Sequence, residues 1–348
     1  MKVSVGIVAY NEEKNLPRIL GDLIKQTFPH DQIEVVLVDS RSEDGTRDLM
    51  QKFSKENKEE FLNIQVVDNP KRRQSCGWNC AIQAFTTEAL IRVDAHSSIP
   101  PEFVAGNVAA LEEGEMVTGG VRPNIVEEKS SWQQVLLTAE SSMFGSSAAG
   151  FRREGEKAYV KSFFHGAYRR EVFEKAGVFR EDLGRTEDNE FHYRLRQNGF
   201  RLCMVPGIIS YQMIRPNLRK MCRQKCANGY WIGLTVGVCP GCLSLYHFVP
   251  FAFLCGILFT SLLAWLSFPQ LAVLMWSMYW LMAVGMAFLA VKGQKKYPGY
   301  LLLPALFFFL HVSYGVGTLV GLVKMPFWRR KHASTTNCCT YENQPEKE

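Results

Sequence analysis

The sequence predicts an α/β domain built on a mostly parallel sheet, followed by C-terminal helices that cross a membrane. Two patterns support this prediction: short apolar runs alternate with longer helical stretches in the N-terminal part, and long uncharged segments fill the C-terminal third. The chain has 348 residues, of which 47% are hydrophobic, so it can bury a full core and has room for about two domains.

The N-terminal apolar runs have the character of strands buried on both faces, because they are short, rich in β-branched residues and nearly continuous in apolar character. These runs are Val3–Val8, Ile33–Val38, Ile64–Val67 and Leu90–Val93. The stretches that separate them are long enough for crossover helices: Glu12–Gln26, Gly45–Lys58 and Gln74–Phe85. Strands that alternate with helices form a parallel sheet, and ligands of such sheets bind outside the carboxyl ends of the strands.

Polar side chains lie at those carboxyl ends. Asp39 follows the second run, and Asp94 and His96 follow the fourth in the stretch "RVDAHS". Because side chains alternate along a strand, Asp94 and His96 should project to the same side, which makes them candidate ligands for Mn²⁺ or Mg²⁺. An isolated Asp-x-His pair is also compatible with a strand end that meets solvent, so the neighbouring motifs have to decide.

The neighbouring motifs favour a nucleotide diphosphate. Asp39 can accept hydrogen bonds from a nucleotide base or ribose. The sequence contains neither Gly-x-Gly-x-x-Gly nor the Gly-Lys-Ser/Thr of a P-loop, so the diphosphate would need another source of positive charge. A divalent cation stabilises the charge that grows on a leaving diphosphate. Arg72 and Arg73, in "KRRQSCGWN", either add to that positive charge or form a solvated basic loop.

A second group of polar residues lies further along the chain. The stretch "GRTEDNEFHYRLRQNGFRL" (Gly184–Leu202) predicts a helix that follows Thr186 as N-cap and begins with acidic residues, which is ordinary capping chemistry. Asp188, however, would stand at the mouth of a loop, where a carboxylate can take the proton from an attacking hydroxyl. Upstream, "FFHGAYRREVFEKAGVF" (Phe163–Phe179) predicts a strand or loop with Gly166, followed by a helix.

Two segments of the C-terminal third contain no Asp, Glu, Lys or Arg: Cys226–Val291 and Tyr297–Val323. A water-exposed surface needs charges every few residues, so we expect this part of the chain in a membrane. At about 20 apolar residues per spanning helix, Phe248–Phe268 and Leu271–Val291 each suffice to cross, joined as a hairpin by "SFPQ". Leu301–Val323 is a third candidate.

Basic clusters on both sides of the third candidate leave its topology open. These clusters are Lys292, Lys295 and Lys296 before it, and Arg329, Arg330 and Lys331 after it. The positive-inside rule would place both in the cytoplasm, which a single crossing between them cannot satisfy. Either the segment is re-entrant or bent at Pro304 and its glycines, or one cluster is translocated.

Two features lead us to expect the N-terminal domain in the cytoplasm. Its first apolar run, Val3–Tyr10, is too short for a signal peptide. The ten cysteines show no secreted disulfide framework and fit a reducing compartment. The "CPGC" stretch at Cys239–Cys242 lies beside the membrane hairpin and is interpreted as a turn with reduced thiols.

Together these motifs resemble those of a family-2 glycosyltransferase with the GT-A fold. The resemblance extends from Lys2 to about Trp231, with "AYNEE", "VDSRSEDGT", "WNCAI", "VDAHS", "HGAYRREVFEKAG" and "TEDNEFHYRLRQNG" in the family's order. With Asp-Ala-His in place of the commoner Asp-x-Asp, and with its apolar tail, the chain is most similar to membrane-attached enzymes that build bacterial exopolysaccharides, the succinoglycan-synthesis type.

The resemblance implies a role for each motif. The residues expected to bind substrate are Tyr10, Glu12, Asp39, Arg73, Asp94, His165, Gly166 and Glu187. Among them, Tyr10, Glu12 and Asp39 would line the uridine pocket, and His165 with Gly166 would border the acceptor. Asp94 and His96 would hold Mn²⁺ or Mg²⁺ together with the donor's diphosphate. Asp188 would be the general base.

The implied reaction is a metal-dependent displacement at the anomeric carbon, with inversion, from a UDP-linked donor. Processive synthases carry Gln-x-x-Arg-Trp after the base, whereas "RQKCANGYW" has Gln224 and Trp231 at another spacing, which favours transfer of a single sugar. The expected partners are a nucleotide sugar, a polyprenyl-diphosphate-linked saccharide and the lipid bilayer, with no nucleic acid. The implied location is the bacterial inner membrane, with the catalytic domain in the cytoplasm.

The expected domains are a catalytic domain (1–231), an interfacial connector (232–247), about three membrane segments (248–323) and a basic tail (324–348) with a disordered end. Three other functions stay open at this point. Transfer directly to polyprenyl phosphate needs no base, which would make Asp188 less important, and polymerisation with export would need a sugar channel. A transporter with a nucleotide-sensing head would carry ionisable residues in its spans, and His311 is the only one in the third segment.

Overall fold

The computed structural model describes residues 1–126, 130–145, 156–295 and 297–332. The chain divides into two compact units. The first contains the described residues of 1–123 and 151–212, and the second contains those of 124–150 and 213–331. The chain therefore enters the second unit twice, once as a short insertion and once as the long C-terminal part.

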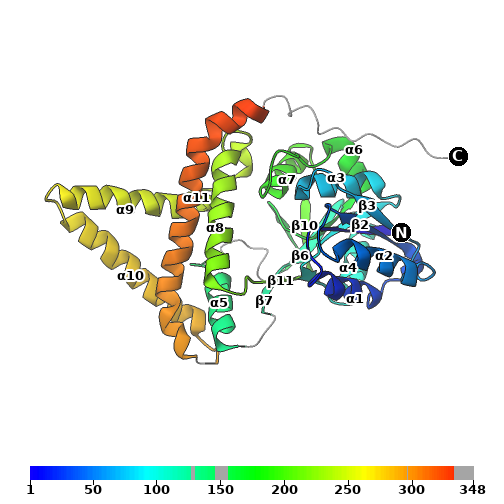
Figure 1. The fold of residues 1–348 in the computed structure, drawn as a ribbon, viewed down its shortest axis with the longest axis horizontal. Helices are drawn as coiled ribbons and strands as arrows, with labels where there is room; N and C mark the ends of the chain where they lie inside the picture. Colours follow the sequence, from blue (N-terminus) through cyan, green and yellow to red (C-terminus); the bar gives the residue numbers. More distant parts are fainter. Residues whose placement is uncertain (127–129, 146–155, 296, 333–348) are drawn as a thin grey trace. The chain divides into compact units, whose positions relative to one another are not determined.

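A sheet forms the centre of the first unit (Figure 1). It has eight strands, in the order β3-β2-β1-β4-β9-β6-β10-β8. Its strands are β1 (Val3–Ala9), β2 (Ile33–Asp39), β3 (Asn63–Asp68), β4 (Ala89–Asp94), β6 (Val117–Val121), β8 (Ala158–Val160), β9 (Gly166–Arg169) and β10 (Leu202–Ile209). The strands β1 to β4 run parallel to one another, as do β6 and β10. β9 is antiparallel to both β4 and β6, and β8 is antiparallel to β10. The mostly parallel sheet predicted from the alternating pattern is confirmed.

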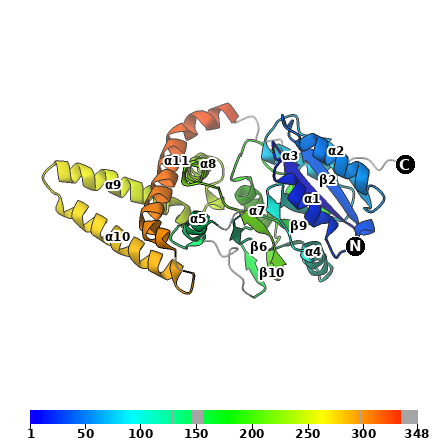
Figure 2. The same cartoon turned by 60° about the horizontal axis from the view of Figure 1, so that its bottom comes forward.

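Helices cover both faces of this sheet (Figures 1 and 2). One face packs against α1 (Leu16–Ile24), α2 (Thr46–Asn57) and α4 (Phe103–Glu112). The other packs against α3 (Gln74–Ala84), α6 (Arg170–Ala176) and α7 (Glu187–Gln197). Along β2, Val35 and Leu37 join the first core cluster and Val36 and Val38 join the second, as expected for a strand buried on both faces.

The remaining elements are short. The strands β5 (Ser97–Ser98) and β11 (Tyr211–Met213) pair antiparallel, and β7 (Asn124–Ile125) belongs to the second unit. Turns of 3₁₀ helix occur at His30–Gln32, Pro240–Cys242, Leu245–Phe248 and Pro298–Leu302. The turn expected at "CPGC" is therefore present as Pro240–Cys242.

The second unit consists mainly of helices: α5 (Ser131–Ser141), α8 (Leu218–Thr235), α9 (Val249–Trp265), α10 (Gln270–Val291) and α11 (Leu303–His332). Within the described residues, three helical segments are long and apolar enough to cross a membrane: Leu245–Trp265, Gln270–Val291 and Pro298–His332. The hairpin of α9 and α10 exposes large apolar side chains, such as Trp265 at 81% and Leu281 at 77%. Exposure on this scale is unfavourable in water and suits contact with lipid.

The structure divides the chain at a different place from the expected boundary at residue 231. α8 runs through this position without a break and belongs to the second unit, which resumes at Met213. The expected connector at 232–247 therefore begins inside a helix. The reason is that α8 packs closely against α11. A Cβ on Gly229 of α8 would lie 2.1 Å from the carbonyl oxygen of Tyr314, and a Cβ on Gly233 would lie 2.6 Å from that of Thr318.

Of the two alternatives left open for the third membrane segment, the bent or re-entrant one does not agree with the structure, because α11 is one continuous helix. Pro304 lies in its first turn, where proline fits a helix. The glycines of α11 allow close packing against α8 and do not bend the helix. A Cβ on Gly317 would lie 2.0 Å from the carbonyl oxygen of Cys226, and a Cβ on Gly321 would lie 2.2 Å from that of Tyr230, both in α8. α11 also includes 324–332 of the expected tail, while Lys296 and 333–348 lie outside the described residues.

Replacing Gly317 with Ala is expected to destabilise the second unit by about 1–3 kcal/mol, because the added methyl group would meet the backbone of α8. Gly285 of α10 is the matched control, since a Cβ there meets nothing within 4 Å and alanine favours a helix. Thermal unfolding of the full chain in detergent measures the difference. Equal melting temperatures for the two variants would contradict the close α8–α11 contact.

Candidate active site

The topology of the sheet brings the candidate residues of the first unit to one edge. β1 separates β2 from β4, and the register places Asp39 and Asp94 on either side of the end of β1. β6 runs in the same direction as β4, so Arg122 follows it at this edge. β9 runs the opposite way, so His165, which precedes it, lies at the same edge. The site is therefore assembled from distant parts of the sequence.

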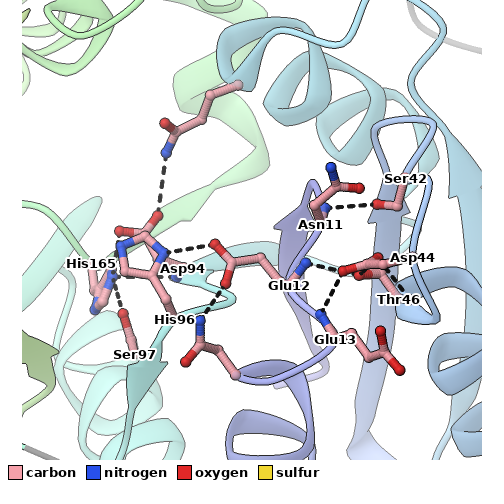
Figure 3. A network of polar contacts seen from close by, with 12 residues as sticks. Asn11, Glu12, Glu13, Ser42, Asp44, Thr46, Asp94, His96, Ser97 and His165 are labelled. Carbon is pink, nitrogen blue, oxygen red and sulfur yellow. Dashed lines mark hydrogen bonds and ion pairs between the residues drawn. The ribbon is translucent and has the colours of Figure 1, made fainter. Parts of the chain in front are cut away.

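The loops after the first three strands contain left-handed backbone at non-glycine residues, namely Asn11 (φ 53°), Arg41 (φ 56°) and Arg72 (φ 57°). Such conformations cost about 1–3 kcal/mol each and persist where the surroundings impose them, often at binding sites. Here hydrogen bonds join the loops after β1 and β2: Asn11 N–H donates to Ser42 Oγ at 3.0 Å, and Glu12 N–H donates to Thr46 Oγ1 at 2.8 Å (Figure 3). This rim is held in one conformation by its own hydrogen bonds.

Three side chains hold the carboxylate of Asp94. Its Oδ2 lies 3.3 Å from Nη1 of Arg122 and 3.2 Å from Nε2 of His165, and its Oδ1 accepts a hydrogen bond from Gln74 at 3.4 Å. Burial alone would raise the pKa of this carboxyl, but the hydrogen bond and charge of His165 and the charge of Arg122 hold the pKa well below its usual range. Asp94 is therefore anionic at neutral pH.

His165, which we expect to border the acceptor, lies against Asp94 (Figure 3). Its Nε2 lies 3.3 Å from both the backbone nitrogen of Asp94 and the Oγ of Ser97. Burial lowers the pKa of His165 to about 4, against the opposing influence of Asp94, so the ring is neutral at pH 7. Gly166 has a packing reason for lacking a side chain, because a Cβ there would lie 2.2 Å from the ring of Phe163.

His96 does not continue the strand. β4 ends at Asp94 and His96 lies in the turn that follows, so the alternation argument for a shared side does not apply. Its Nδ1 lies 3.5 Å from Oε1 of Glu12, which reaches over from the loop after β1 (Figure 3). The charge of His96 also contributes to lowering the pKa of Asp94, so the two side chains are near enough to interact.

Asp94 and His96 fit a divalent cation that arrives with a phosphate ligand. Among the described residues, no group of three or more His, Cys, Asp or Glu side chains could hold a metal ion. Mg²⁺ at phosphate-processing sites is typically bound by one or two carboxylates and completes its shell with substrate phosphates and water. Asp94 supplies a hard, anionic oxygen and His96 a nitrogen, which Mn²⁺ also accepts.

Asp188 is held by a buried arginine of the sheet. Its Oδ1 accepts a hydrogen bond from Nη1 of Arg92 at 2.5 Å. The guanidinium of Arg92 lies 4.3 Å from the ring centroid of Trp78 and 4.6 Å from that of Phe179. Arg92 precedes Asp94 by two residues in β4, so both side chains leave the strand on the same face of the sheet. This arrangement directs Asp188, from the start of α7, to that face.

The two neighbouring acids at the start of α7 differ in environment. Burial raises the pKa of Asp188 above its ordinary value, although the charge of Arg92 opposes this effect. Burial and the charge of Asp188 raise the pKa of Glu187 to about 8, and its Oε2 is buried without a hydrogen-bond partner among the described residues. At neutral pH, Glu187 therefore holds a proton, whereas Asp188 lies against the charge of Arg92, which opposes the effect of burial on its pKa.

Replacing Glu187 with Gln is expected to change how stability depends on pH. The folded-state pKa of about 8 exceeds the ordinary value of 4.5, so the contribution of Glu187 to stability is complete below pH 4.5 and declines as the pH rises toward 8. The decline is about 1.4 kcal/mol per pH unit, and glutamine removes it. Melting temperatures of both proteins at pH 5 and pH 8 measure the effect. If the melting temperature of the variant, relative to that of the unmodified protein, does not rise between pH 5 and pH 8, the prediction is wrong.

Two further expected residues lie at the ends of β1 and β2. Asp39 is buried, its Oδ1 accepts a hydrogen bond from Ser42 N–H at 3.1 Å, and its Oδ2 lies 3.4 Å from Nη1 of Arg47. Tyr10 is 45% exposed, and the guanidinium of Arg72 lies over its ring at 5.9 Å. An exposed aromatic ring beside a buried carboxylate is a suitable lining for a planar, hydrogen-bonding ligand.

Arg73 and two arginines that the sequence analysis left without a role complete the site. Nη1 of Arg73 donates to the carbonyl oxygen of Glu181, which ties the start of α3 to the loop before α7. Arg92 and Arg122 were missed. The signal for Arg92 is a charge inside an apolar strand, which requires a buried partner. The signal for Arg122 is a charge directly after the apolar run "MVTGGV", which is the pattern that identified Asp39 and Asp94.

Comparison with known proteins places these residues in a family context. The family model "Glycosyl transferase family 2" matches residues 4–177. A dolichyl N-acetyl-alpha-D-glucosaminyl phosphate 3-beta-D-2,3-diacetamido-2,3-dideoxy-beta-D-glucuronosyltransferase of Methanococcus voltae is 25% identical over 331 residues, which cover 92% of this chain and 97% of the relative. Succinoglycan biosynthesis protein ExoA of Rhizobium meliloti is 27% identical over 204 residues, which cover 57% of this chain and 59% of the relative.

Solved structures support the same fold. The mannosyltransferase PcManGT from Pyrobaculum calidifontis, in complex with GDP-Man and Mn²⁺, superposes with a TM-score of 0.56 at 17% identity. The match covers 91% of this chain and 87% of that protein. At this identity the likeness concerns the fold alone, and it confirms the expected GT-A architecture with C-terminal helices.

Proposed function

The chain belongs to glycosyl transferase family 2, and we propose that it transfers one sugar, with inversion, from a nucleotide sugar to a lipid-linked saccharide. The observation that carries this proposal is a pair of carboxyl groups in the first unit whose pKa values shift in opposite directions. Asp94 is held anionic beside Arg122, whereas burial raises the pKa of Asp188. The first suits a cation and a leaving diphosphate, and the second suits proton transfer.

The donor would bind across the ends of β1, β2 and β4. Asp39 would accept hydrogen bonds from uridine or ribose, with Tyr10 and Glu12 at the mouth. Asp94 and His96 would hold Mn²⁺ or Mg²⁺, which supplies the positive charge that a departing diphosphate needs. The mannosyltransferase complex contains Mn²⁺ together with a nucleotide sugar, which supports the use of a divalent cation.

Asp188 would act as the general base. The acceptor oxygen attacks the anomeric carbon from the side opposite the diphosphate, its proton passes to the carboxylate of Asp188, and the bond to the diphosphate oxygen breaks. Arg92 fixes one oxygen of this carboxylate, so the group is oriented before the acceptor arrives. One carboxylate is sufficient because a neutralised diphosphate leaves without a proton. Such a displacement inverts the configuration at the anomeric carbon.

The acceptor would be a saccharide on a polyprenyl diphosphate or polyprenyl phosphate. The name of the Methanococcus voltae relative, which this chain matches over 97% of its length, describes transfer to a dolichyl phosphate-linked sugar. The succinoglycan relative supports a role in exopolysaccharide or capsule synthesis. The three apolar helices would keep the site beside such a lipid and raise its effective concentration. We place the chain in the bacterial inner membrane, with its catalytic unit on the cytoplasmic side.

The proposal is tested with membranes that contain the full chain. Radiolabelled UDP-glucose, UDP-N-acetylglucosamine, UDP-glucuronate and GDP-mannose are each supplied with polyprenyl phosphate, or with the same lipid carrying a sugar through a phosphate or diphosphate. We expect label in the lipid fraction only with a sugar-bearing lipid, extended by one residue and dependent on Mn²⁺ or Mg²⁺. Label on bare polyprenyl phosphate, or a long polymer, would contradict the proposed acceptor. Membranes with Asp188→Asn serve as the matched control.

A further inference from the structure

The helices α8 and α11 run side by side in the same direction. Gly229 of α8 approaches Tyr314 of α11, and Gly233, one turn later, approaches Leu322. The first turns of α8 lie beside the N-terminal part of α11, because one apolar cluster contains residues of both: Leu218, Met221, Cys222, Leu306, Phe307 and Leu310. The depth at which α8 lies in a membrane therefore follows from the position of α11.

Three basic side chains in the first turns of α8 are exposed: Arg219, Lys220 and Arg223. A membrane crossing needs about 20 residues of α11. If the uncharged part of α11, residues 303–323, filled the hydrocarbon, these three charges beside it would be exposed to lipid, where a charged side chain is costly. If the crossing began beyond the level of Arg223, it would include Lys324 and Arg329, which are also exposed. Neither position keeps the exposed charges of the helix pair out of the hydrocarbon.

α11 separates α8 from the hairpin of α9 and α10, which extends from α11 on the side away from α8 (Figures 1 and 2). The base of the hairpin packs on α11, where the backbone of Pro250 meets Gly315. Within residues 303–323 of α11, every exposed side chain is apolar: Phe309, Val316, Leu319, Val320 and Val323. Phe309, Val316 and Val323 repeat every seven residues and therefore share one face of the helix. The helical unit thus has an apolar side that carries the hairpin, whereas the exposed charges of α8 lie beyond α11.

Both ends of α11 carry exposed basic side chains: Lys292 and Lys295 precede the helix, and Lys324, Arg329, Arg330 and Lys331 lie in its last turns. A crossing by α11 would put these two groups on opposite sides of the membrane, against the positive-inside rule. A helix that lies along the surface keeps both groups on one side, where anionic headgroups attract them. Near the C-terminal end, the rings of Trp231 and Trp328 meet edge to face at 6.3 Å, and tryptophan is enriched at the membrane–water interface.

We propose that α11 lies along the surface of the membrane, with α8 on its water side and the hairpin of α9 and α10 as the part that enters the lipid. The exposed apolar side chains of α11 then contact acyl chains at the boundary with the headgroups, as in other interfacial helices. The basic side chains at both ends of α11 lie at the level of the headgroup phosphates. The exposed charges of α8 stay in water. This arrangement is independent of the sugar and of the acceptor.

A membrane-impermeant maleimide, applied to right-side-out and to inverted vesicles that contain the full chain, reports the side on which each end of α11 lies. Gln294→Cys and Lys331→Cys mark the two ends, and Lys55→Cys marks an exposed position of α2 in the first unit. The unmodified chain gives the background from its own cysteines. Lys55→Cys and Gln294→Cys serve as references for one side, because the hairpin returns to the side from which it enters. We expect Lys331→Cys to react in the same vesicles as both references. Reaction of Lys331→Cys only in the other vesicles would overturn the proposal.

Spin labels along α11 test its direction separately. Labels at Phe309→Cys, Val316→Cys and Val323→Cys report their depth in vesicles of phosphatidylethanolamine and phosphatidylglycerol, through collisions with oxygen and with a water-soluble nickel complex. The unmodified protein, treated in the same way, supplies the background. We expect three equal depths, all shallower than that of Leu262→Cys in the hairpin. In a crossing helix, consecutive sites would differ by about 10 Å along the membrane normal. Depths that change in such steps, or a label at Leu262→Cys no deeper than those on α11, would overturn the proposal.

Discussion

Replacing Asp188 with Asn is expected to lower turnover by about a hundredfold or more while donor binding persists. Asparagine has nearly the same shape, and its amide oxygen can still accept the hydrogen bond that Arg92 now donates to Oδ1. It cannot, however, take a proton from the acceptor hydroxyl. Single-turnover rates measure the loss, and calorimetric titration with the nucleotide sugar measures binding by the same protein.

Glu190 provides the matched control for Asp188. It lies in the same first turn of α7, but it pairs with Arg194 at 2.9 Å and not with Arg92. Glu190→Gln therefore removes an acid from the helix start without touching the pair that orients Asp188, and turnover should stay near the unmodified rate. Full activity of Asp188→Asn would exclude Asp188 as the base. Loss of turnover in Glu187→Gln with a normal Asp188→Asn would assign that role to Glu187.

Replacing Asp94 with Ala is expected to remove most of the gain in UDP affinity that Mn²⁺ provides, a loss of about tenfold or more. Asp94 is the anionic oxygen ligand of the proposed cation site, and a cation held there would supply positive charge to the diphosphate. Titration of UDP with and without Mn²⁺ measures the effect. The same substitution leaves Arg122 buried without its carboxylate, so the melting temperature should fall as well.

His96→Ala separates these two effects, because no ion pair joins His96 to Arg122 among the described contacts of the rim. It should weaken Mn²⁺-dependent UDP binding in the same direction with a smaller change in melting temperature. Asp31→Asn is the control, since Asp31 is exposed and precedes β2 at the opposite edge of the sheet. If Mn²⁺ strengthens UDP binding equally in Asp94→Ala and in the unmodified chain, the cation site is elsewhere.

The part of the fold that local patterns encode was predictable from the sequence. β1 to β4 and the helices between them follow one another along the chain, so each apolar run and each crossover identifies the next element. The helix of Glu187–Gln197 and the membrane hairpin likewise have local signals, in acidic capping and in the absence of charge. The pattern of the first strands therefore correctly predicted that Asp39 and Asp94 lie at the same edge of the sheet, on either side of β1.

The parts that depend on long-range pairing were not predictable in the same way. β6 is short and rich in glycine, and it joins the sheet through β9 and β10, which lie far away in the sequence. Arg122 at its end was missed for that reason. The first half of α8 is basic and resembles a helix of a soluble domain. Only the close contacts of its glycines with the backbone of α11 show that α8 belongs to the second unit. The contact of His165 with Asp94 was not predicted, because the position of His165 follows from the antiparallel pairing of β9.

The double entry of the chain into its helical unit has a practical consequence for protein production. Cutting after residue 231 would keep most of α8 and remove α11, so that Gly229 would face water instead of the helix it fits. Cutting at Gln212 would still leave α5 behind, with Glu140 deprived of Lys225, its buried ion-pair partner at 2.6 Å. A water-soluble catalytic fragment therefore requires two changes: a stop codon after Gln212 and an internal deletion of the segment around α5. A short linker would rejoin the two chain ends that this deletion leaves.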